Sequence, residues 1–258
     1  MAPIKILFFD IDGTLLDHAT GAISPNTRKT LQLLHRQGFL LCIATGRGPA
    51  SLPDLEGLHF DAFCTYNGSL CYTEEKTLLS NPLAPRDVSQ VIRNAAAIGR
   101  PVSLCGRSGF AANGIDRDLS DYFRLAELEL TVNPDFDRAA AEAVYQILVG
   151  FRESDRTPLL ENTAGVRLAI SWERAADVVP VSSSKGAAIQ KILEHFHLDA
   201  SQAMAFGDSY NDIEMLQTVG TGIAMGNAPE LLKSIATDVC GSVSQDGIYH
   251  YCLNHGLI

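Results

Sequence analysis

Two aspartates one residue apart, Asp10 and Asp12, follow the apolar run from Ile4 to Phe9 in the stretch FFDIDGTLLD. A buried strand seldom finishes in two acids, and the following Gly13 favours a turn over further strand. A carboxylate can attack phosphorus and form an aspartyl phosphate. A second carboxylate two positions away can protonate the leaving oxygen and later deprotonate water. The spacing therefore predicts a pair in which one acid attacks and the other transfers the proton.

Further polar residues follow apolar stretches later in the chain. They are Thr45, Gly46 and Arg47 after FLLCIAT, Asp208, Asn211 and Asp212 after AMAFG, and Lys185 at the start of a predicted helix. Ligands of open α/β sheets bind at the carboxyl ends of the strands. If these ends converge, Asp10, Asp12 and Asp208 form an acidic, oxygen-rich site. Such a site suits a hard cation, and Mg²⁺ fits best when the substrate supplies a phosphate oxygen.

A hydroxyl, backbone N–H groups and an ammonium suit the remaining oxygens of a bound phosphate. Thr45, the glycine-containing turns and Lys185 provide groups of these three kinds. The residues alone therefore predict a phosphate site next to the cation site. This inference rests on topology, because the sequence does not show that the strand ends are neighbours.

The elements that must position these residues alternate between strand and helix at both ends of the chain. Residues 4–9, 39–45 and 60–66 are continuous apolar runs, as expected for strands buried on both faces. Between the first two, Ser24 and Pro25 predict a helix start, and Gly38 predicts its end. After Pro180, the pattern predicts helices over 185–196 and 212–219 and strands over 203–207 and 221–225.

The middle of the chain has a different pattern. Pro82 and Pro85 precede a predicted helix, and strand-like segments follow at 101–105, 145–151 and 166–172 among longer irregular stretches. The fold class predicted is α/β: a Rossmann-like parallel sheet core with an inserted α+β domain. Residues 1–82 and 182–258 are predicted to form the core, and residues 83–181 the insertion.

Composition limits the classes of function. The chain has 258 residues and a formal net charge of −10, which argues against a broad nucleic-acid surface or an anionic membrane face. No apolar run approaches the ~18 residues that a transmembrane helix needs. The six cysteines include no CxxC pair, and the N-terminal residues do not resemble a signal peptide. We therefore expect a cytoplasmic protein with reduced thiols and no nucleic-acid or membrane partner.

DIDGT at 10–14, Thr45, Lys185 and GDSYND at 207–212 resemble, in this order, the four motifs of the haloacid dehalogenase-like (HAD) phosphatases. ATGR at 44–47, the pair Asn67-Gly68, AFGDSYNDIEML and AMGNAPE are similar to the Cof-like sugar-phosphatase branch. That branch carries an α+β cap between the second and third motifs, where the insertion at 83–181 lies. The match covers both ends of the chain, whereas the middle matches only in position and general pattern.

The resemblance implies a role for each motif residue. Asp10 would be the nucleophile and a Mg²⁺ ligand, and Asp12 the general acid/base, which binds the metal through its backbone carbonyl. Thr45 and Lys185 would hold the phosphoryl group. Asp208 would bind Mg²⁺, and Asp212 would support the metal site. The resemblance also places Gly46, Arg47 and Asn211 where they could contact substrate.

Each of these residues also has a purely structural explanation. A DxD alone is often a solvated turn, and a lysine at a helix start is usually exposed. Thr45 could simply end a strand, and Arg47 could form a surface ion pair. GDSYND could be a turn that caps the following helix, which is compatible with metal binding.

The leading hypothesis is a Mg²⁺-dependent phosphatase for small phosphorylated metabolites. One alternative is a phosphotransferase or phosphomutase that uses the same chemistry. Another is a protein that binds phosphorylated metabolites without catalysis. The sequence leaves the substrate, the cap residues that select it and the oligomeric state open.

Overall fold

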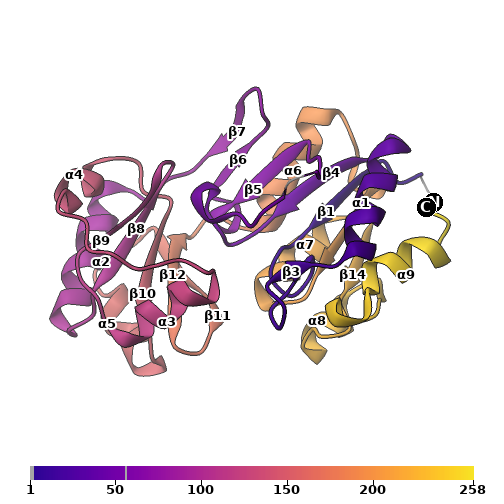
Figure 1. The fold of residues 1–258 in the computed structure, drawn as a ribbon. Helices are drawn as coiled ribbons and strands as arrows, with labels where there is room; N and C mark the ends of the chain where they lie inside the picture. Colours follow the sequence, from indigo (N-terminus) through magenta and orange to yellow (C-terminus); the bar gives the residue numbers. More distant parts are fainter. Residues whose placement is uncertain (1–2, 56) are drawn as a thin grey trace. The chain divides into compact units, whose positions relative to one another are not determined.

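The computed structural model describes residues 3–55 and 57–258 and divides into two compact units (Figure 1). The first unit contains the residues up to Gly46, Asp54–Leu79 and Ser184–Ile258, and the second contains Arg47–Pro53 and Ser80–Ser183. The predicted insertion at 83–181 thus lies within the second unit. The segment Arg47–Pro53 joins the second unit because its short helical turn, Pro49–Ser51, contacts strand β9 (Gly109–Ala112).

The first unit is built on a mostly parallel sheet with the strand order β15-β14-β13-β1-β4-β5-β6-β7. The strands from β15 to β5 in this order run parallel, and β6 is antiparallel to β5. The strands are β1 (Ile6–Phe9), β4 (Leu40–Ala44), β5 (Ala62–Thr65), β6 (Leu70–Tyr72), β7 (Thr77–Ser80), β13 (Ala203–Gly207), β14 (Thr221–Ala224) and β15 (Asp238–Val239). A separate antiparallel pair is formed by β2 (Leu16–Asp17) and β3 (Ala22–Ile23).

Helices cover both faces of this sheet (Figure 1). They are α1 (Pro25–Arg36), α6 (Lys185–Phe196), α7 (Ile213–Thr218), α8 (Glu230–Ile235) and α9 (Gly247–Asn254). Ile6 and Phe8 of β1 belong to the core cluster formed with α6, α7 and α8. Phe9 stacks on Phe206, which contacts Tyr251 of α9 on the other face. Because both faces are buried, β1 is apolar at every position, as predicted.

The local signals that predicted the start of α1 are confirmed. The Ser24 hydroxyl caps α1 by accepting the Thr27 N–H at 3.0 Å, and Pro25 is the first helical residue. Ser184 caps α6 in the same way by accepting the Ala187 N–H at 3.1 Å. Helix α6 begins at Lys185, so the backbone of the catalytic candidate is fixed by a helix start.

The second unit is an α+β structure. Its sheet has the order β11-β12-β10-β8-β9, and each neighbouring pair is antiparallel. The elements are α2 (Pro85–Ala97), β8 (Val102–Gly106), β9, α3 (Arg117–Leu125), α4 (Phe136–Ala141), β10 (Gln146–Gly150), α5 (Arg156–Leu160), β11 (Val166–Trp172) and β12 (Ala175–Pro180). One sheet face packs on α2 and α4, and Phe123 of α3 contacts Phe110 on the other.

None of the helices in the described part of the chain combines the length and hydropathy needed to span a bilayer.

Candidate active site

The strand order of the first unit brings the predicted site residues together. β1 lies between β13 and β4, with Phe9 opposite both Phe206 and Ile43. The hydrogen bonding between β1 and β13 continues one residue beyond Phe9, since the Asp10 N–H donates to the Phe206 carbonyl at 3.0 Å. Asp10 and Asp208 therefore leave adjacent strands at the same edge. This edge carries the carboxyl ends of the strands, where the sequence predicted a site.

A buried ammonium joins two of the acids. Lys185 Nζ donates to Oδ1 of Asp10 and to Oδ1 of Asp212, at 2.6 Å in each case. The side chain of Lys185 is 0% exposed, that of Asp212 0% and that of Asp10 6%. A lysine is rarely buried unless it is paired, and the two carboxylates that Lys185 contacts explain its burial here. The explanation of Lys185 as an exposed residue at a helix start is therefore wrong.

Asp212 organises the loop that follows β13. Its Oδ2 accepts the N–H groups of Asp208 and Ser209, both at 2.9 Å, while its Oδ1 accepts from Lys185. A Cβ at Gly207 would lie 2.6 Å from the Asp212 carboxyl carbon, so only glycine fits there. Asp212 is thus held on both oxygens by protein donors and fixes the backbone that carries Asp208.

Asp208 lies at the open side of the cluster and is held by two polar groups. The Thr14 hydroxyl donates to its Oδ1 at 3.1 Å, and the Asn227 amide donates to its Oδ2 at 3.3 Å. Asn227 also donates to the Gly13 carbonyl at 2.9 Å, and its own oxygen accepts the Val243 N–H at 3.0 Å. Asn227 therefore ties three separate loops together around Asp208.

The electrostatics of the cluster reflect several acids around one ammonium. Burial raises the pKa of Asp10 well above its ordinary value, against the opposing effect of Lys185. Burial by itself would lower the pKa of Lys185, but the carboxylates of Asp10 and Asp212 outweigh it and raise that pKa. Burial and then the charge of Asp212 raise the pKa of Asp208 to about 7. Lys185 accordingly stays charged, and the surplus negative charge favours binding of a proton or a cation.

The donor set fits Mg²⁺. Asp10, Asp208 and Asp212 each offer a carboxylate oxygen, and these three atoms lie within 4.8 Å of one another. Mg²⁺ takes oxygen ligands and is commonly held by one or two carboxylates together with water and substrate phosphate. Because the oxygens of Asp212 already accept three protein hydrogen bonds, Asp10 and Asp208 are better placed to hold the ion directly.

Asp12 lies in the turn that leads from β1 to β2. It is half-buried, whereas Asp10 is buried. It lies near enough to the cluster for its charge to raise the pKa of Asp10 and of Asp208. The turn is closed by the Thr14, Leu15 and Leu16 N–H groups, which all donate to the Ile11 carbonyl. The two acids therefore stand at one edge with different exposure to solvent.

Thr45 and its neighbours line the other side of the site. Thr45 is buried at the end of β4, its N–H donates to the Cys64 carbonyl and its carbonyl accepts the Asn67 N–H at 3.0 Å. The Asn67 side-chain oxygen accepts from the Asn211 amide at 3.0 Å. A Cβ on Gly46 would lie 3.2 Å from the Asn67 amide. Gly46, Asn67 and Asn211 thus form one contiguous group beside Thr45.

The turn at Tyr66–Gly68 stores backbone strain next to Lys185. Tyr66, Asn67 and Gly68 all have left-handed backbones, with φ of 52°, 53° and 92°. A Cβ on Gly68 would lie 2.1 Å from the Ser184 carbonyl oxygen, at the start of α6. Strained residues of this kind gather at functional sites, because the surrounding structure must hold them. The turn packs the loop after β5 directly against the helix start that carries Lys185.

Arg47, predicted to contact substrate, lies outside the first unit. It belongs to the second unit, where its guanidinium donates to the Ser51 carbonyl at 2.9 Å. The structure brings together Asp10, Thr45, Gly46, Lys185, Asp208, Asn211 and Asp212 in the first unit, with Asp12 beside them.

Thr14, Asn67 and Asn227 are not among the predicted site residues. Thr14 and Asn67 lie inside stretches that carried the family resemblance, DIDGT and the pair Asn67-Gly68, and Asn227 lies in AMGNAPE. Membership of these stretches was therefore the sequence signal that could have identified the three residues. Their contacts join residues 194, 144 and 214 positions apart, which no local pattern shows.

Gly13 offers a test of the geometry. Its φ is +81°, and a Cβ there would lie 2.2 Å from Oδ2 of Asp208. We expect Gly13→Ala to displace Asp208 and to lower kcat/KM for phosphate esters by about 10²-fold, as for other small displacements of catalytic groups. Steady-state kinetics over a Mg²⁺ series would measure the change, with the loss appearing partly as weaker Mg²⁺ activation.

Gly38→Ala is the matched control for this variant. Gly38 also has a left-handed backbone, with φ of +87°, but nothing lies within 4 Å of its added Cβ. Both variants should therefore lose thermal stability from backbone strain, and only Gly13→Ala should lose activity. Equal activity of the two variants would show that the position of Asp208 does not affect turnover.

The raised pKa of Asp208 predicts how stability depends on pH without metal. Its folded-state pKa of about 7 exceeds the ordinary value of 3.8, so the folded state binds this proton more tightly. The associated stability is complete below pH 3.8 and is lost as pH rises through about 7. Without metal, Asp208→Asn should therefore have the same melting temperature as wild type at low pH and a higher one above pH 7. Mg²⁺ should raise the melting temperature of wild type strongly and that of Asp208→Asn little.

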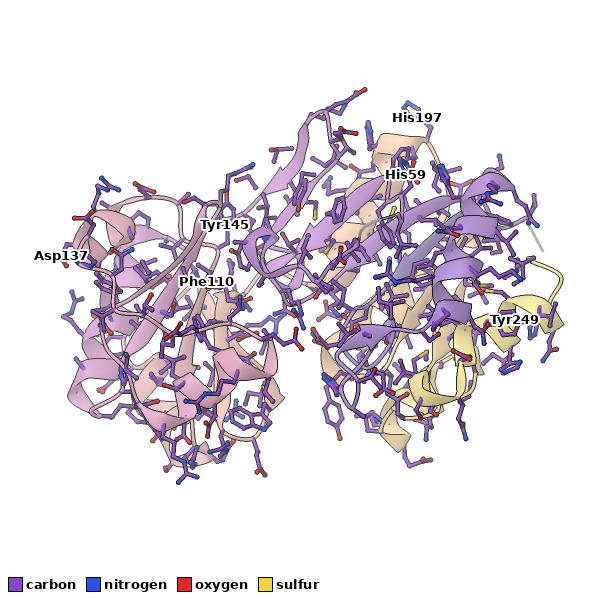
Figure 2. All side chains as sticks on the ribbon, in the orientation of Figure 1. His59, Phe110, Asp137, Tyr145, His197 and Tyr249 are labelled. Carbon is purple, nitrogen blue, oxygen red and sulfur yellow. The ribbon has the colours of Figure 1, made fainter. Side chains whose placement is uncertain are left out.

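Thermal unfolding with a chelator and with Mg²⁺, at several pH values, would measure this difference. Asp137→Asn is the control, because Asp137 is an exposed residue of the second unit (Figure 2). It should follow the wild-type curve at every pH. If Asp208→Asn gained as much from Mg²⁺ as wild type, the ion would bind elsewhere.

Comparison with known proteins places this site in a family. A family model described as haloacid dehalogenase-like hydrolase matches residues 7–252. The Bacillus subtilis (strain 168) protein named "Putative phosphatase YkrA" is 32% identical over 260 residues, which cover 98% of each chain. An HMP-PP phosphatase of Yersinia pestis (strain Pestoides F) is 33% identical over 276 residues and covers 98% of this chain and 95% of its own.

A solved structure extends the likeness to the fold. The chain superposes on BT4131, described as a HAD subclass IIB sugar phosphatase, with a TM-score of 0.90 at 27% identity. The superposition covers 98% of this chain and 100% of that one. Both the α/β class and the presence of an inserted domain are thereby confirmed.

Proposed function

Because the chain belongs to the haloacid dehalogenase-like hydrolases and is an enzyme of their phosphatase type, we propose that it hydrolyses small phosphomonoesters with Mg²⁺ as cofactor. The observation that carries the proposal is the bridge of Lys185 between Asp10 and Asp212, with Asp208 alongside. This arrangement combines a buried attacking carboxylate, a fixed positive charge and an oxygen site for a cation. Transfer of a phosphoryl group through an aspartyl phosphate uses all three.

Asp10 is the nucleophile of the proposal. Lys185 holds its Oδ1 at 2.6 Å, which fixes the carboxylate and leaves Oδ2 to attack phosphorus. Burial disfavours the charged form of Asp10, and the ammonium of Lys185 opposes this effect. Attack forms the Asp10–phosphorus bond and breaks the bond from phosphorus to the leaving oxygen. Asp10, Asp208 and the Asp12 backbone carbonyl would hold Mg²⁺, whose charge offsets that of the phosphoryl oxygens.

Asp12 donates its proton to the leaving oxygen and then removes a proton from water. Its greater exposure suits this role, because a shuttling acid must exchange protons with solvent, whereas Asp10 must not. Water then attacks the phosphorus of the aspartyl phosphate and releases phosphate. Thr45, Lys185 and the backbone N–H groups beside Gly46 hold the phosphoryl oxygens through both steps.

Asp212 acts by positioning. It holds Lys185 with one oxygen and the backbone of Asp208 and Ser209 with the other. Asn211 and Asn67 form the polar wall next to Thr45, where substrate can be bound.

We assign the choice of substrate to the second unit and to Arg47, following the insertion's predicted role as a cap. A cytoplasmic location remains a prediction.

The protonation role of Asp12 predicts a dependence on the leaving group. Asp12→Asn should lower turnover of alkyl phosphates by about 10²–10⁴-fold, because their leaving oxygen requires a proton. The loss should be much smaller for formation of the phosphoenzyme from para-nitrophenyl phosphate, whose leaving group is stable as an anion. Rapid-quench measurement of the first turnover with both esters would separate this step from hydrolysis. An equal loss for both esters would exclude a general-acid role.

The whole proposal is tested by release of phosphate from a panel of metabolites at neutral pH, with Mg²⁺ and with a chelator. The panel contains sugar phosphates, pyridoxal phosphate, nucleotides, flavin phosphate and HMP-PP, because relatives are named for the first and last of these. Hydrolysis that requires Mg²⁺ would support the proposal. Absence of turnover across the panel, with tight binding of one compound, would instead favour a binding protein.

A further inference from the structure

A second group of metal-ligating side chains lies in the first unit, at the opposite edge of the sheet. His35 is in the last turn of α1, and His59 and Asp61 immediately precede β5. The proposed catalytic residues follow the carboxyl ends of the strands, whereas His59 and Asp61 lie at the amino end of β5. His59 is labelled in Figure 2. The group is therefore separated from the catalytic carboxylates by the length of the strands.

The spacing of the donor atoms suits one ion. One atom from each of the three side chains lies within 4.8 Å of the other two, and His59 Nε2 lies 3.2 Å from Asp61 Oδ1. Two ligands at about 2.0–2.1 Å from a tetrahedral ion are about 3.3 Å apart, so this pair already has the required separation. The rings of His35 and His59 have centroids 4.3 Å apart. His35 is exposed and can close the remaining gap by side-chain rotation.

One ligand is preorganised by the sheet. Asp61 exchanges two hydrogen bonds with Leu41 of β4: its backbone N–H donates to the Leu41 carbonyl at 2.7 Å, and its Oδ2 accepts the Leu41 N–H at 2.8 Å. The other oxygen, Oδ1, faces His59. The buried Phe60 side chain anchors the segment between the two ligands. The carboxylate is thus fixed by strand β4, and the imidazoles reach it from the solvent side.

From this arrangement we propose that His35, His59 and Asp61 form a second metal site, which binds a divalent transition cation of the Zn²⁺ class. Two imidazole nitrogens and one carboxylate oxygen suit such cations, whereas Mg²⁺ prefers oxygen ligands throughout. The catalytic cluster offers only oxygens, so the two imidazole nitrogens distinguish this site from it. Three protein ligands leave one or more positions for water.

Binding at this site would tie the end of α1 to the entry of β5. These segments are 24 positions apart between His35 and His59, and the ion would cross-link them only in the folded chain. A ligand that binds only the folded state raises its stability. The proposed ion is therefore structural, and turnover at saturating Mg²⁺ should not depend on it.

Co²⁺ is a suitable probe, because its visible absorption reports nitrogen ligands and low coordination number. Wild-type protein in excess Mg²⁺ should bind one Co²⁺ with such an absorption band and gain thermal stability. His59→Ala and Asp61→Asn should each lower the affinity at least 10-fold. Asp61→Asn keeps an oxygen that can accept the Leu41 N–H, so its fold should be intact.

Two further variants make the result specific. His250→Ala removes an exposed helical histidine of α9 and should bind Co²⁺ as wild type does. Asp208→Asn alters the catalytic cluster and should also keep the band. Loss of the band in Asp208→Asn, or its persistence in His59→Ala, would overturn the proposal. So would the absence of a Co²⁺ band in the wild-type protein.

Discussion

Asp10→Asn should reduce turnover by on the order of 10⁴-fold or more, while the protein remains folded. The substitution keeps the shape of the side chain and removes the charge that attacks phosphorus in the proposed mechanism. Lys185 retains Asp212 as a carboxylate partner at 2.6 Å, and the amide oxygen can still accept one of its hydrogen bonds. Because burial disfavours the charged form of Asp10, a neutral isostere should not destabilise the metal-free protein.

Two measurements would examine this expectation. Steady-state release of phosphate gives the loss in turnover, with Asp17→Asn as a control carboxylate that lies at the end of β2. Partitioning gives the mechanism: in wild type, esters with different leaving groups should divide their phosphoryl group between water and an added alcohol in one constant ratio. A constant ratio requires a common phosphoenzyme. More than about a tenth of wild-type turnover in Asp10→Asn would refute attack by Asp10.

The sequence was sufficient where a structural signal is local. The predicted helix at 185–196 and the strand at 203–207 agree with α6 and β13. The former has a serine cap, and the latter is an apolar run bounded by a turn. The predicted helix at 212–219 is longer by one residue at each end than α7, since Asp212 belongs to the preceding turn. Helix ends depend on the loops that flank them.

The sequence was insufficient where long-range contacts decide the structure. Strand β12 was not predicted, because its buried run contains Asp177, which is satisfied by the Tyr122 hydroxyl of α3 at 2.9 Å. Strand β9 begins with glycine and is stabilised by its pairing with β8. Arg47 follows the second motif directly, yet its segment packs with the second unit.

The same division applies to the site. Asp10 and Asp12 were predicted because a buried strand seldom finishes in two acids, whereas Lys185 was predicted from its place after the insertion, where the family resemblance expects a lysine. Asn227 and Thr14 carry no chemical signal of their own, since asparagine and threonine are common in turns. Gly13 lies between these cases. Its place in DIDGT was recognised, but the reason for a glycine is the Asp208 carboxylate 195 positions later.

Lys185→Met should act on both rate and stability. Methionine keeps the length and the apolar stem of lysine but removes the charge that holds Asp10 and Asp212. Loss of one preorganised donor to the transferring phosphoryl group typically costs about 10²–10³-fold in rate. Removal of one partner from a buried ion pair typically costs about 3–5 kcal/mol of stability, because the remaining charge is left without compensation.

The stability loss should itself depend on pH and metal. Without Lys185 the carboxylates of Asp10, Asp208 and Asp212 face one another, so the folded protein should bind protons more tightly. Metal-free Lys185→Met should therefore be least stable at high pH, and Mg²⁺ should restore part of the loss by replacing the missing positive charge.

Lys191→Met is the control on the same helix, because Lys191 is exposed and pairs only with Glu194 among the described residues. Its expected effect on stability is below about 1 kcal/mol. Thermal unfolding across pH, followed by kinetics at saturating Mg²⁺ below the melting temperature, would separate the two effects. Wild-type kinetics in a folded Lys185→Met protein would mean that the buried ammonium serves the fold alone and that another cation stabilises the phosphoryl group.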